Sequence, residues 1–254
     1  MKLPVRPVAV VMAVILSLAT VSACGGGSSK KQDTLMVFAA SSLTGAFSTL
    51  GKDFEKKYPG VRVVFNFGPS SGLAEQIVHG APAGVFASAS PTTMDPVVER
   101  GDAKLPQTFA SNSMEIVVPA ANPGKVTGLR DLARPGLKVA VCQIRVPCGV
   151  TAAEVFKKAG TTVRPVTEEA DVKSVLTKVG LGEVDAGVVY VTDALAAGSK
   201  VKGITIPAAQ NASTAYPIAV LTHAKHARQA QEFVDLVLSS DGAKVLRDAG
   251  FQKP

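Results

Sequence analysis

The chain has 254 residues, of which 46% are hydrophobic and 19% charged, and its formal net charge is +7 at pH 7. This length suffices for one sizeable core or for two small lobes. The Lys and Arg residues are spread along the chain in nothing longer than short pairs such as Lys56-Lys57 and Lys157-Lys158. The positive charge therefore indicates a solvated surface, and we expect no nucleic-acid partner.

The first 23 residues have the pattern of a secretory signal peptide. Two basic residues precede an apolar run, and small residues lead to Cys24. Val21-Ser-Ala-Cys24 is similar to the bacterial lipobox, which implies cleavage before Cys24 and acyl chains such as palmitate on its sulfur and new amino terminus. The alternative is an ordinary signal peptide with Cys24 as a spare thiol. The glycine-rich residues 24–32 predict a flexible tether. We expect an exported protein, anchored by lipid to the outer face of the cytoplasmic membrane.

Two predicted strand-to-helix junctions carry paired serines. The first strand, ending at Ala40, is followed by Ser41 and Ser42, and the second, ending at Phe67, by Ser70 and Ser71. The first N–H groups of a helix lack intrahelical partners and lie at the positive end of the helix dipole, so such an end binds anions. Helix capping is the alternative role for these serines. Because parallel strands end along one edge of a sheet, both junctions can converge on one small anion.

The remaining elements alternate between strands and helices, which predicts an α/β fold with mainly parallel strands. The periodicity predicts strands at 34–39, 61–67, 84–88, 114–119, 137–142, 184–190, 203–207 and 216–222. It predicts helices at 43–57, 71–79, 92–100, 127–133, 149–159, 170–179, 192–197 and 226–248.

Two cysteines remain after Cys24 is assigned to lipid. Outside the cytoplasm an even pair favours a disulfide, here between Cys142 and Cys148, which would close a small loop. A metal or redox pair is the alternative. The chain has no Cys-x-x-Cys, and its three histidines are far from this pair in sequence.

Six short motifs then occur in a fixed order: Phe38–Thr44 (FAASSLT), Ser70–Ala74 (SSGLA), Gly80–Ala83 (GAPA), Val146–Gly149 (VPCG), Gly187–Tyr190 (GVVY) and Ala215–Ile218 (AYPI). In this order they resemble the periplasmic molybdate-binding proteins, the substrate-binding components of molybdate ABC transporters. The resemblance covers nearly the whole mature chain, from about Thr34 to Phe251.

The resemblance implies a two-lobed, type II periplasmic binding-protein fold, in which each lobe is a mainly parallel sheet flanked by helices. Residues 33–112 and 217–254 would form the first lobe, and residues 113–216 the second. The ligand would lie in the cleft between the lobes and favour the closed arrangement by contacting both.

The resemblance also implies a ligand set made of three side-chain hydroxyls and two backbone N–H groups. The hydroxyls are those of Ser42, Ser70 and Tyr190, and the N–H groups are those of Cys148 and Val172.

Cys148 departs from the family, which has alanine there, but a main-chain contact survives a change of side chain. A disulfide to Cys142 could stiffen the turn. Ser41 is an additional candidate hydroxyl, and Asp171, beside Val172, is expected to cap a helix or to support the site from outside.

These groups suit molybdate and tungstate, which are tetrahedral dianions with acceptors only. A hydrogen phosphate carries a proton and would need an acceptor in the pocket. A sulfate binder of the same fold is an alternative, since only size separates the ions. A serine hydrolase is a further alternative, but no histidine lies in a loop expected to meet Ser42 or Ser70.

We therefore expect a binding protein and not an enzyme. It would be a monomer without a cofactor, holding molybdenum only as the oxyanion. Its partners would be that oxyanion, the permease of an ABC transporter and, through the lipid, the membrane.

Overall fold

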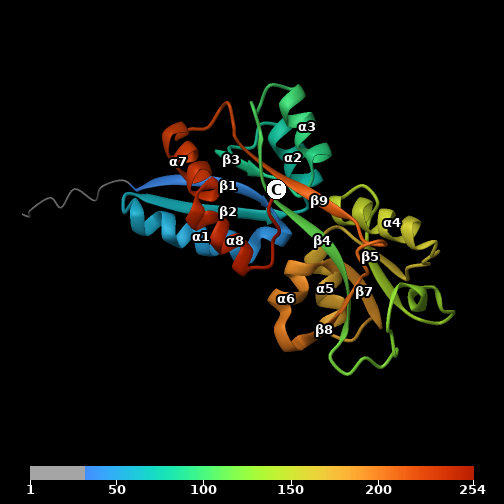
Figure 1. Ribbon diagram of the computed structural model, residues 1–254. Coiled ribbons are helices and arrows are strands. Elements are labelled where there is room, and N and C mark those ends of the chain that lie inside the picture. The colour runs from blue at the N-terminus through green and yellow to red at the C-terminus, as the bar shows by residue number, and fades with distance from the viewer. Residues whose placement is uncertain (1–31) are drawn as a thin grey trace, which may run out of the picture. The chain divides into compact units, whose positions relative to one another are not determined.

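The computed structural model describes residues 32–254 (Figure 1). The predicted signal peptide, the lipidation site at Cys24 and most of the predicted tether lie outside the described residues. Within residues 32–254, no helix is both long and apolar enough to cross a membrane.

One continuous path of hydrogen-bonded strands runs through the protein in the order β2-β1-β3-β9-β4-β7-β5-β6, and β8 pairs with β4. The strands are β1 (Asp33–Ala40), β2 (Val61–Gly68), β3 (Val85–Ala87), β4 (Gln107–Pro119), β5 (Val139–Cys142), β6 (Thr167–Glu169), β7 (Ala186–Tyr190), β8 (Val201–Thr205) and β9 (Ser213–Val220).

The parallel pairing predicted from the sequence is found at both ends of this path. Strand β1 pairs in parallel with β2 and β3, and β5 pairs in parallel with β6 and β7. In the middle, β4 and β9 run antiparallel to each other and to their other neighbours. The first half of β4 pairs with β9, and its second half with β7 and β8, so this one strand joins both ends of the path.

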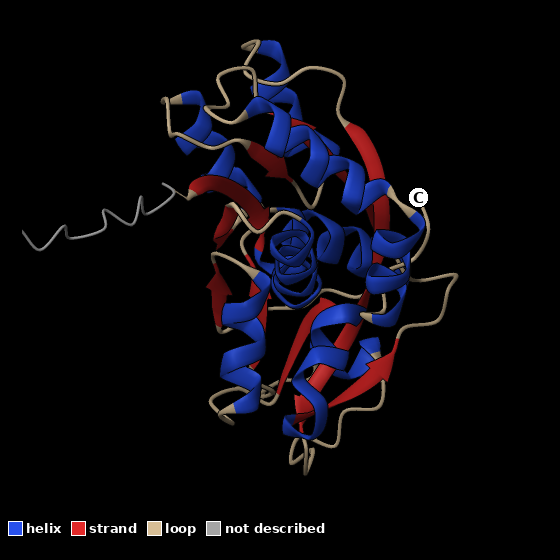
Figure 2. Ribbon diagram, turned by 90° about the vertical axis from the view of Figure 1, so that its left-hand side faces the viewer, coloured by secondary structure: helices blue, strands red, loops and turns tan. Residues whose placement is uncertain are grey.

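Helices flank the strands in both parts (Figures 1 and 2). They are α1 (Thr44–Lys57), α2 (Ser70–Val78), α3 (Pro91–Glu99), α4 (Pro147–Ala159), α5 (Val172–Gly180), α6 (Val191–Ala197), α7 (Ala227–Leu238) and α8 (Ser240–Asp248), with 3-10 turns at Ser41–Leu43, Leu129–Ala133 and Gly198–Lys200.

Some expectations about elements were wrong in detail, and the strand expected at 114–119 begins at Gln107. The helix predicted at 226–248 is interrupted at Ser239, whose backbone is extended and whose side chain accepts a hydrogen bond from Gly242 N at 3.1 Å, capping α8. The helix predicted at 127–133 is only a 3-10 turn. Strand β6 was missed because its three residues, Thr-Glu-Glu, carry no apolar pattern; it is held by its ladder with β5.

Buried hydrophobic residues form separate cores in the two parts. One core is built from residues between Met114 and Ala212. The other part has two clusters, one spanning Leu35 to Phe251 and one spanning Phe38 to Leu221, with members only before residue 111 and after residue 215. The exact lobe boundaries, at residues 113 and 216, stay a prediction.

Candidate functional site

A single small cavity is lined by all five residues that the sequence assigned to the ligand. It holds about 230 Å³ of space free of protein atoms, its mouth included. Its lining comes from the carboxyl ends of strands in both parts, and the parallel strands explain this convergence. The lining residues are Ala40, Ser41, Ser42, Gly68, Pro69, Ser70 and Ala89 from one part, and Val146, Pro147, Cys148, Ala170, Asp171, Val172 and Tyr190 from the other.

The first residues of three helices line the cavity with their main-chain groups. Helices α2 and α4 begin at Ser70 and Pro147, and no side chain caps either of them. Helix α5 begins at Val172 and is capped by Asp171, whose Oδ1 accepts from Lys173 N at 2.7 Å and from Ser174 N at 3.1 Å. This cap leaves the Val172 N–H unused. Such uncapped N–H groups attract anions.

The two predicted serines do not cap their helices, so the capping alternative is wrong for both. Ser70 Oγ accepts a hydrogen bond from Ala89 N at 3.0 Å, which leaves the Ser70 hydroxyl hydrogen free to donate. Ser42 Oγ lies 2.9 Å from the Tyr216 hydroxyl oxygen. Both serines are buried. The hydrogen bond from Ala89 fixes the Ser70 oxygen and leaves its hydrogen available to a ligand, whereas either hydroxyl of the Ser42–Tyr216 pair can be the donor.

Tyr190 ends β7 and brings a phenol to the cavity from the other part of the chain. The side chain is buried, and its hydroxyl oxygen has no hydrogen-bond partner within residues 32–254. Burial raises the pKa of Tyr190 well above its ordinary value, so the phenol stays protonated and can donate. A buried, unpaired polar group is costly, and a ligand is a common reason for one.

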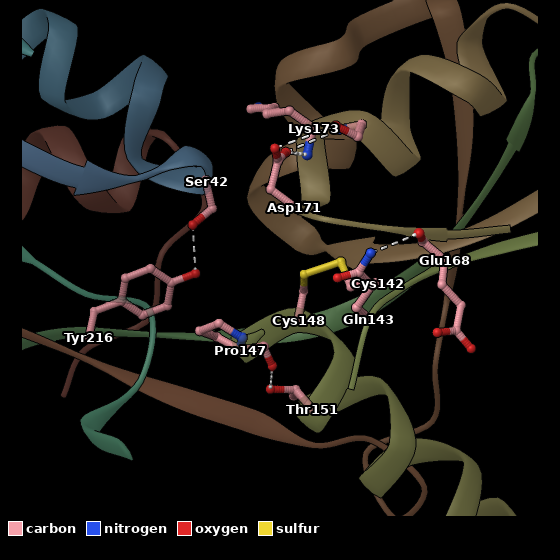
Figure 3. The surroundings of a disulfide bond; sticks show 11 residues. Ser42, Cys142, Gln143, Pro147, Cys148, Thr151, Glu168, Asp171, Lys173 and Tyr216 are labelled. Atoms are coloured by element: carbon pink, nitrogen blue, oxygen red, sulfur yellow. Dashed lines mark hydrogen bonds between the residues drawn. A yellow bond between two sulfur atoms is a disulfide. The ribbon is translucent and has the colours of Figure 1, made fainter. Parts of the chain in front are cut away.

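The predicted disulfide is confirmed. Cys142, the last residue of β5, is bonded to Cys148, the second residue of α4 (Figure 3). The intervening turn is also closed by a hydrogen bond from Val146 N to Gln143 O at 3.1 Å. The disulfide therefore fixes the Cys148 backbone relative to the end of the strand. The described residues contain no group of three or more His, Cys, Asp and Glu that could hold a metal ion.

The cavity lining is almost free of charge. Asp171 is the one carboxylate in the lining, and the start of α5 donates to both of its oxygens, with Lys173 N and Ser174 N at Oδ1 and the Ser174 hydroxyl at Oδ2. Outside the lining, the fully buried Asp193 is paired with Lys173, whose Nζ lies 2.7 Å from Asp193 Oδ1. Burial raises the pKa of Asp193, and Lys173 opposes this rise. The arrangement offers hydrogen-bond donors without a free cation or a free carboxylate at the cavity wall.

Sequence reasoning missed the supporting residues Tyr216 and Asp193. Tyr216 lies in the AYPI motif, but nothing local in the sequence shows that its hydroxyl reaches Ser42, 174 positions earlier. Asp193 sits in the first turn of α6, where an acidic residue is common, and only the fold reveals its burial.

Comparison with known proteins identifies the class to which this fold and cavity belong. Residues 35–252 match the family of bacterial extracellular solute-binding proteins, and the chain belongs to that family. Among its relatives, the molybdate-binding protein ModA of Mycobacterium tuberculosis (strain ATCC 25618 / H37Rv) is 44% identical over 222 residues, which cover 87% of this chain and 85% of the relative. The resemblance to molybdate-binding proteins drawn from the sequence motifs is thereby confirmed.

Solved structures show the same two-lobed fold. The periplasmic molybdate-binding protein of Azotobacter vinelandii superposes with a TM-score of 0.77 at 23% identity, covering 87% of this chain and 99% of that one. The sulfate-binding protein SubI of Mycobacterium tuberculosis superposes with a TM-score of 0.75 at 19% identity, covering 87% of each. At these identities the likeness establishes the fold alone, and the fold does not distinguish the two ions.

Proposed function

We propose that this chain binds molybdate, and also tungstate, outside the cytoplasm and delivers it to the permease of an ABC transporter. The observation that carries the proposal is the donor-only cavity, with the unpaired Tyr190 hydroxyl and the serine-bearing junctions converging on one small space. The ModA relative supports molybdate as the ligand. The assignment of Ser42, Ser70, Cys148, Val172 and Tyr190 as the ligand-binding residues is part of this proposal.

The five proposed hydrogen-bond donors can account for tight binding of an oxyanion. A hydrogen bond to a charged oxygen contributes about 1.5–3 kcal/mol. Five such bonds contribute roughly 7.5–15 kcal/mol, which allows a micromolar dissociation constant, about −8 kcal/mol, when a pre-organised cavity keeps the cost of association near the low end of its range. Oriented backbone dipoles replace a cationic side chain, so the dianion needs no arginine.

Hydrogen phosphate fits this cavity poorly. Its proton needs an acceptor, and the carboxylate in the lining, Asp171, already accepts from two backbone N–H groups at Oδ1 and from the Ser174 hydroxyl at Oδ2. Sulfate shares the acceptor-only chemistry of molybdate, and the fold is common to a sulfate-binding protein. The similarity in sequence to ModA favours the larger ion.

Hydrolysis is disfavoured by the positions of the histidines. His79 Nδ1 lies 2.7 Å from Glu75 O at the end of α2, and His226 Nδ1 lies 3.7 Å from Asp33 Oδ2 at the start of β1. His223 is likewise absent from the residues that line the cavity, so no described histidine can activate Ser42 or Ser70. A binding role without catalysis is the proposal that fits.

Export and anchoring complete the proposal. The signal pattern before Cys24 and the lipobox-like sequence favour a lipoprotein on the outer face of the cytoplasmic membrane, tethered by residues 24–32. The protein would act as a monomer, with residues 113–216 as its second lobe.

Calorimetric titration of the purified protein tests the ligand. We expect tight binding of molybdate and tungstate, far weaker binding of sulfate and none of phosphate. Ser70→Ala should weaken molybdate binding by about 10- to 150-fold, because one charge-assisted hydrogen bond is lost. The neighbouring Ser71, which does not line the cavity, provides the control Ser71→Ala. Equal affinities for sulfate and molybdate would favour the sulfate alternative, and unchanged affinity in Ser70→Ala would refute the assigned pocket.

A further inference from the structure

Tyr216 is a buried tyrosine that is not part of the cavity lining, yet it contacts a proposed ligand residue. It lies on β9, and its side chain has no exposed surface. Its hydroxyl oxygen is 2.9 Å from Ser42 Oγ, and Figure 3 shows the two hydroxyl groups facing each other. This contact joins the first strand-to-helix junction to the strand pair in the middle of the molecule.

The Tyr216 ring is held rigidly by aromatic neighbours. Its centroid lies 5.3 Å from that of Phe251, 6.2 Å from that of Phe109 and 6.1 Å from that of Tyr190, each in an edge-to-face arrangement. Such contacts add to the energy of burial and favour one orientation of the ring. The backbone of Tyr216 is also fixed, because it pairs with Ala110 in the ladder between β9 and β4. The hydroxyl is therefore presented to Ser42 from a fixed position.

The direction of the hydrogen bond follows from the chemistry of the two groups. Each hydroxyl has one hydrogen, and an oxyanion with acceptors only requires Ser42 to donate to it. Ser42 can then only accept from Tyr216. Burial raises the pKa of Tyr216, so the phenol keeps the hydrogen that it must donate.

A second polar group, the Asn112 amide, also faces the Tyr216 hydroxyl. Its effect on the pKa of Tyr216 is smaller than those of burial, Tyr190, Ser42 and Asp193. The Asn112 Nδ2 donates to Thr192 Oγ1 at 2.9 Å, and its Oδ1 has no hydrogen-bond partner in the described part of the chain. Among the described residues, Ser42 is the side chain whose polar atom lies within hydrogen-bond distance of the Tyr216 hydroxyl oxygen, at 2.9 Å.

We propose that Tyr216 is a positioning residue, which donates its hydroxyl hydrogen to Ser42 and thereby turns the Ser42 hydroxyl toward the bound oxyanion. The proposal rests on the proposed function. In the chain Tyr216–Ser42–oxyanion each hydrogen bond polarises the next, so the Ser42 hydroxyl becomes a stronger donor. The Tyr216 ring also packs edge-to-face with Tyr190, so one residue contacts a donor from each part of the molecule.

The test is a double-mutant cycle on molybdate affinity. Tyr216→Phe removes one oxygen and keeps the packed ring. We expect it to weaken molybdate binding about 5- to 30-fold in the wild-type background. In the Ser42→Ala background the same substitution should have little further effect, because its partner is already gone. The melting temperature of each variant is measured without molybdate, and Tyr58→Phe is the control, since Tyr58 packs on Phe54 away from the cavity.

The outcomes separate this inference from the proposed function. If the wild-type protein binds no molybdate, the proposed function fails, and this inference fails with it. If the wild-type protein binds and Tyr216→Phe binds equally well, the positioning role alone is refuted. An equal loss of affinity in both backgrounds would also refute it, because a purely structural effect of Tyr216 would not depend on Ser42.

Discussion

Gly149, the third residue of α4, lies where a side chain cannot fit. A Cβ atom there would lie 1.9 Å from the carbonyl oxygen of Gln143, 2.5 Å from its carbonyl carbon and 2.9 Å from Cys142 O. All three are backbone atoms, so no rotamer change relieves the overlap. The turn is also held at both ends, by the disulfide and by the hydrogen bond from Gln143 N to Glu169 O at 2.9 Å. In Gly149→Ala, the start of α4 must therefore move.

The expected cost can be worked out from these contacts. Overpacking against atoms that cannot yield costs about 3 kcal/mol, at the upper end of the usual range. The better helix propensity of alanine returns about 1 kcal/mol. The net loss of about 2 kcal/mol lowers the melting temperature of a chain of this size by about 4–8 °C. Because the Cys148 N–H moves with the helix start, molybdate affinity should fall by about 10- to 150-fold through the loss of one charge-assisted bond.

Thermal unfolding and calorimetric titration measure the two effects. Gly45→Ala is the matched control, since it makes the same chemical change inside α1, where a Cβ atom would meet nothing within 4 Å. We expect this control to melt at or slightly above the wild-type temperature and to bind molybdate normally. A Gly149→Ala protein with wild-type melting temperature and affinity would refute the assigned role of the turn.

Two further predictions concern stability. Reducing the Cys142–Cys148 disulfide, or replacing both cysteines by serine, should lower the free energy of unfolding by about 2 kcal/mol, as expected for a loop that closes over a sequence separation of 6. Urea unfolding with and without a dithiol measures this, and identical curves would contradict it. Hydrogen bonds from Thr127 hold the pKa of Asp131 below its usual value, so its carboxylate stabilises the fold above about pH 4 and this contribution is lost as the pH falls through the lowered pKa. Asp131→Asn should therefore melt below wild type at pH 7 and close to it at pH 2, and an equal gap at both pH values would count against this account.

The part of the site that the sequence predicts is the part built from local patterns. An apolar strand that ends in serines and continues as a helix can be recognised from a dozen residues, and the parallel arrangement then brings such junctions together. The pairs Ser41-Ser42 and Ser70-Ser71 were found this way, and the motif resemblance selected Ser42 and Ser70 and added Cys148, Val172 and Tyr190. The structure places all five around one cavity, while their roles as ligands stay a prediction.

What the sequence could not supply depends on contacts between distant segments. Tyr216 and Ser42 meet only because β9 returns to the middle of the strand path. The interruption at Ser239 was hidden because the apolar spacing of α7 is followed by a second amphipathic helix, and periodicity alone does not show the cap between them. Strand β4 was expected only at 114–119, because its first half is recognisable as a strand only through its ladder with β9.

Strand β4 has a mechanical consequence if the two lobes close around a ligand, as the resemblance implies. Its first half is hydrogen-bonded to β9, and its second half is hydrogen-bonded to β7 and β8. Hydrogen-bonded strands resist sliding along each other, because a slip of one residue turns every side chain to the opposite face. The register shift between Thr108 and Ala110 bends β4 locally. We expect the two lobes to move as rigid bodies joined by β4 and β9. The donors of the two lobes would then return to the same alignment each time a ligand binds and leaves.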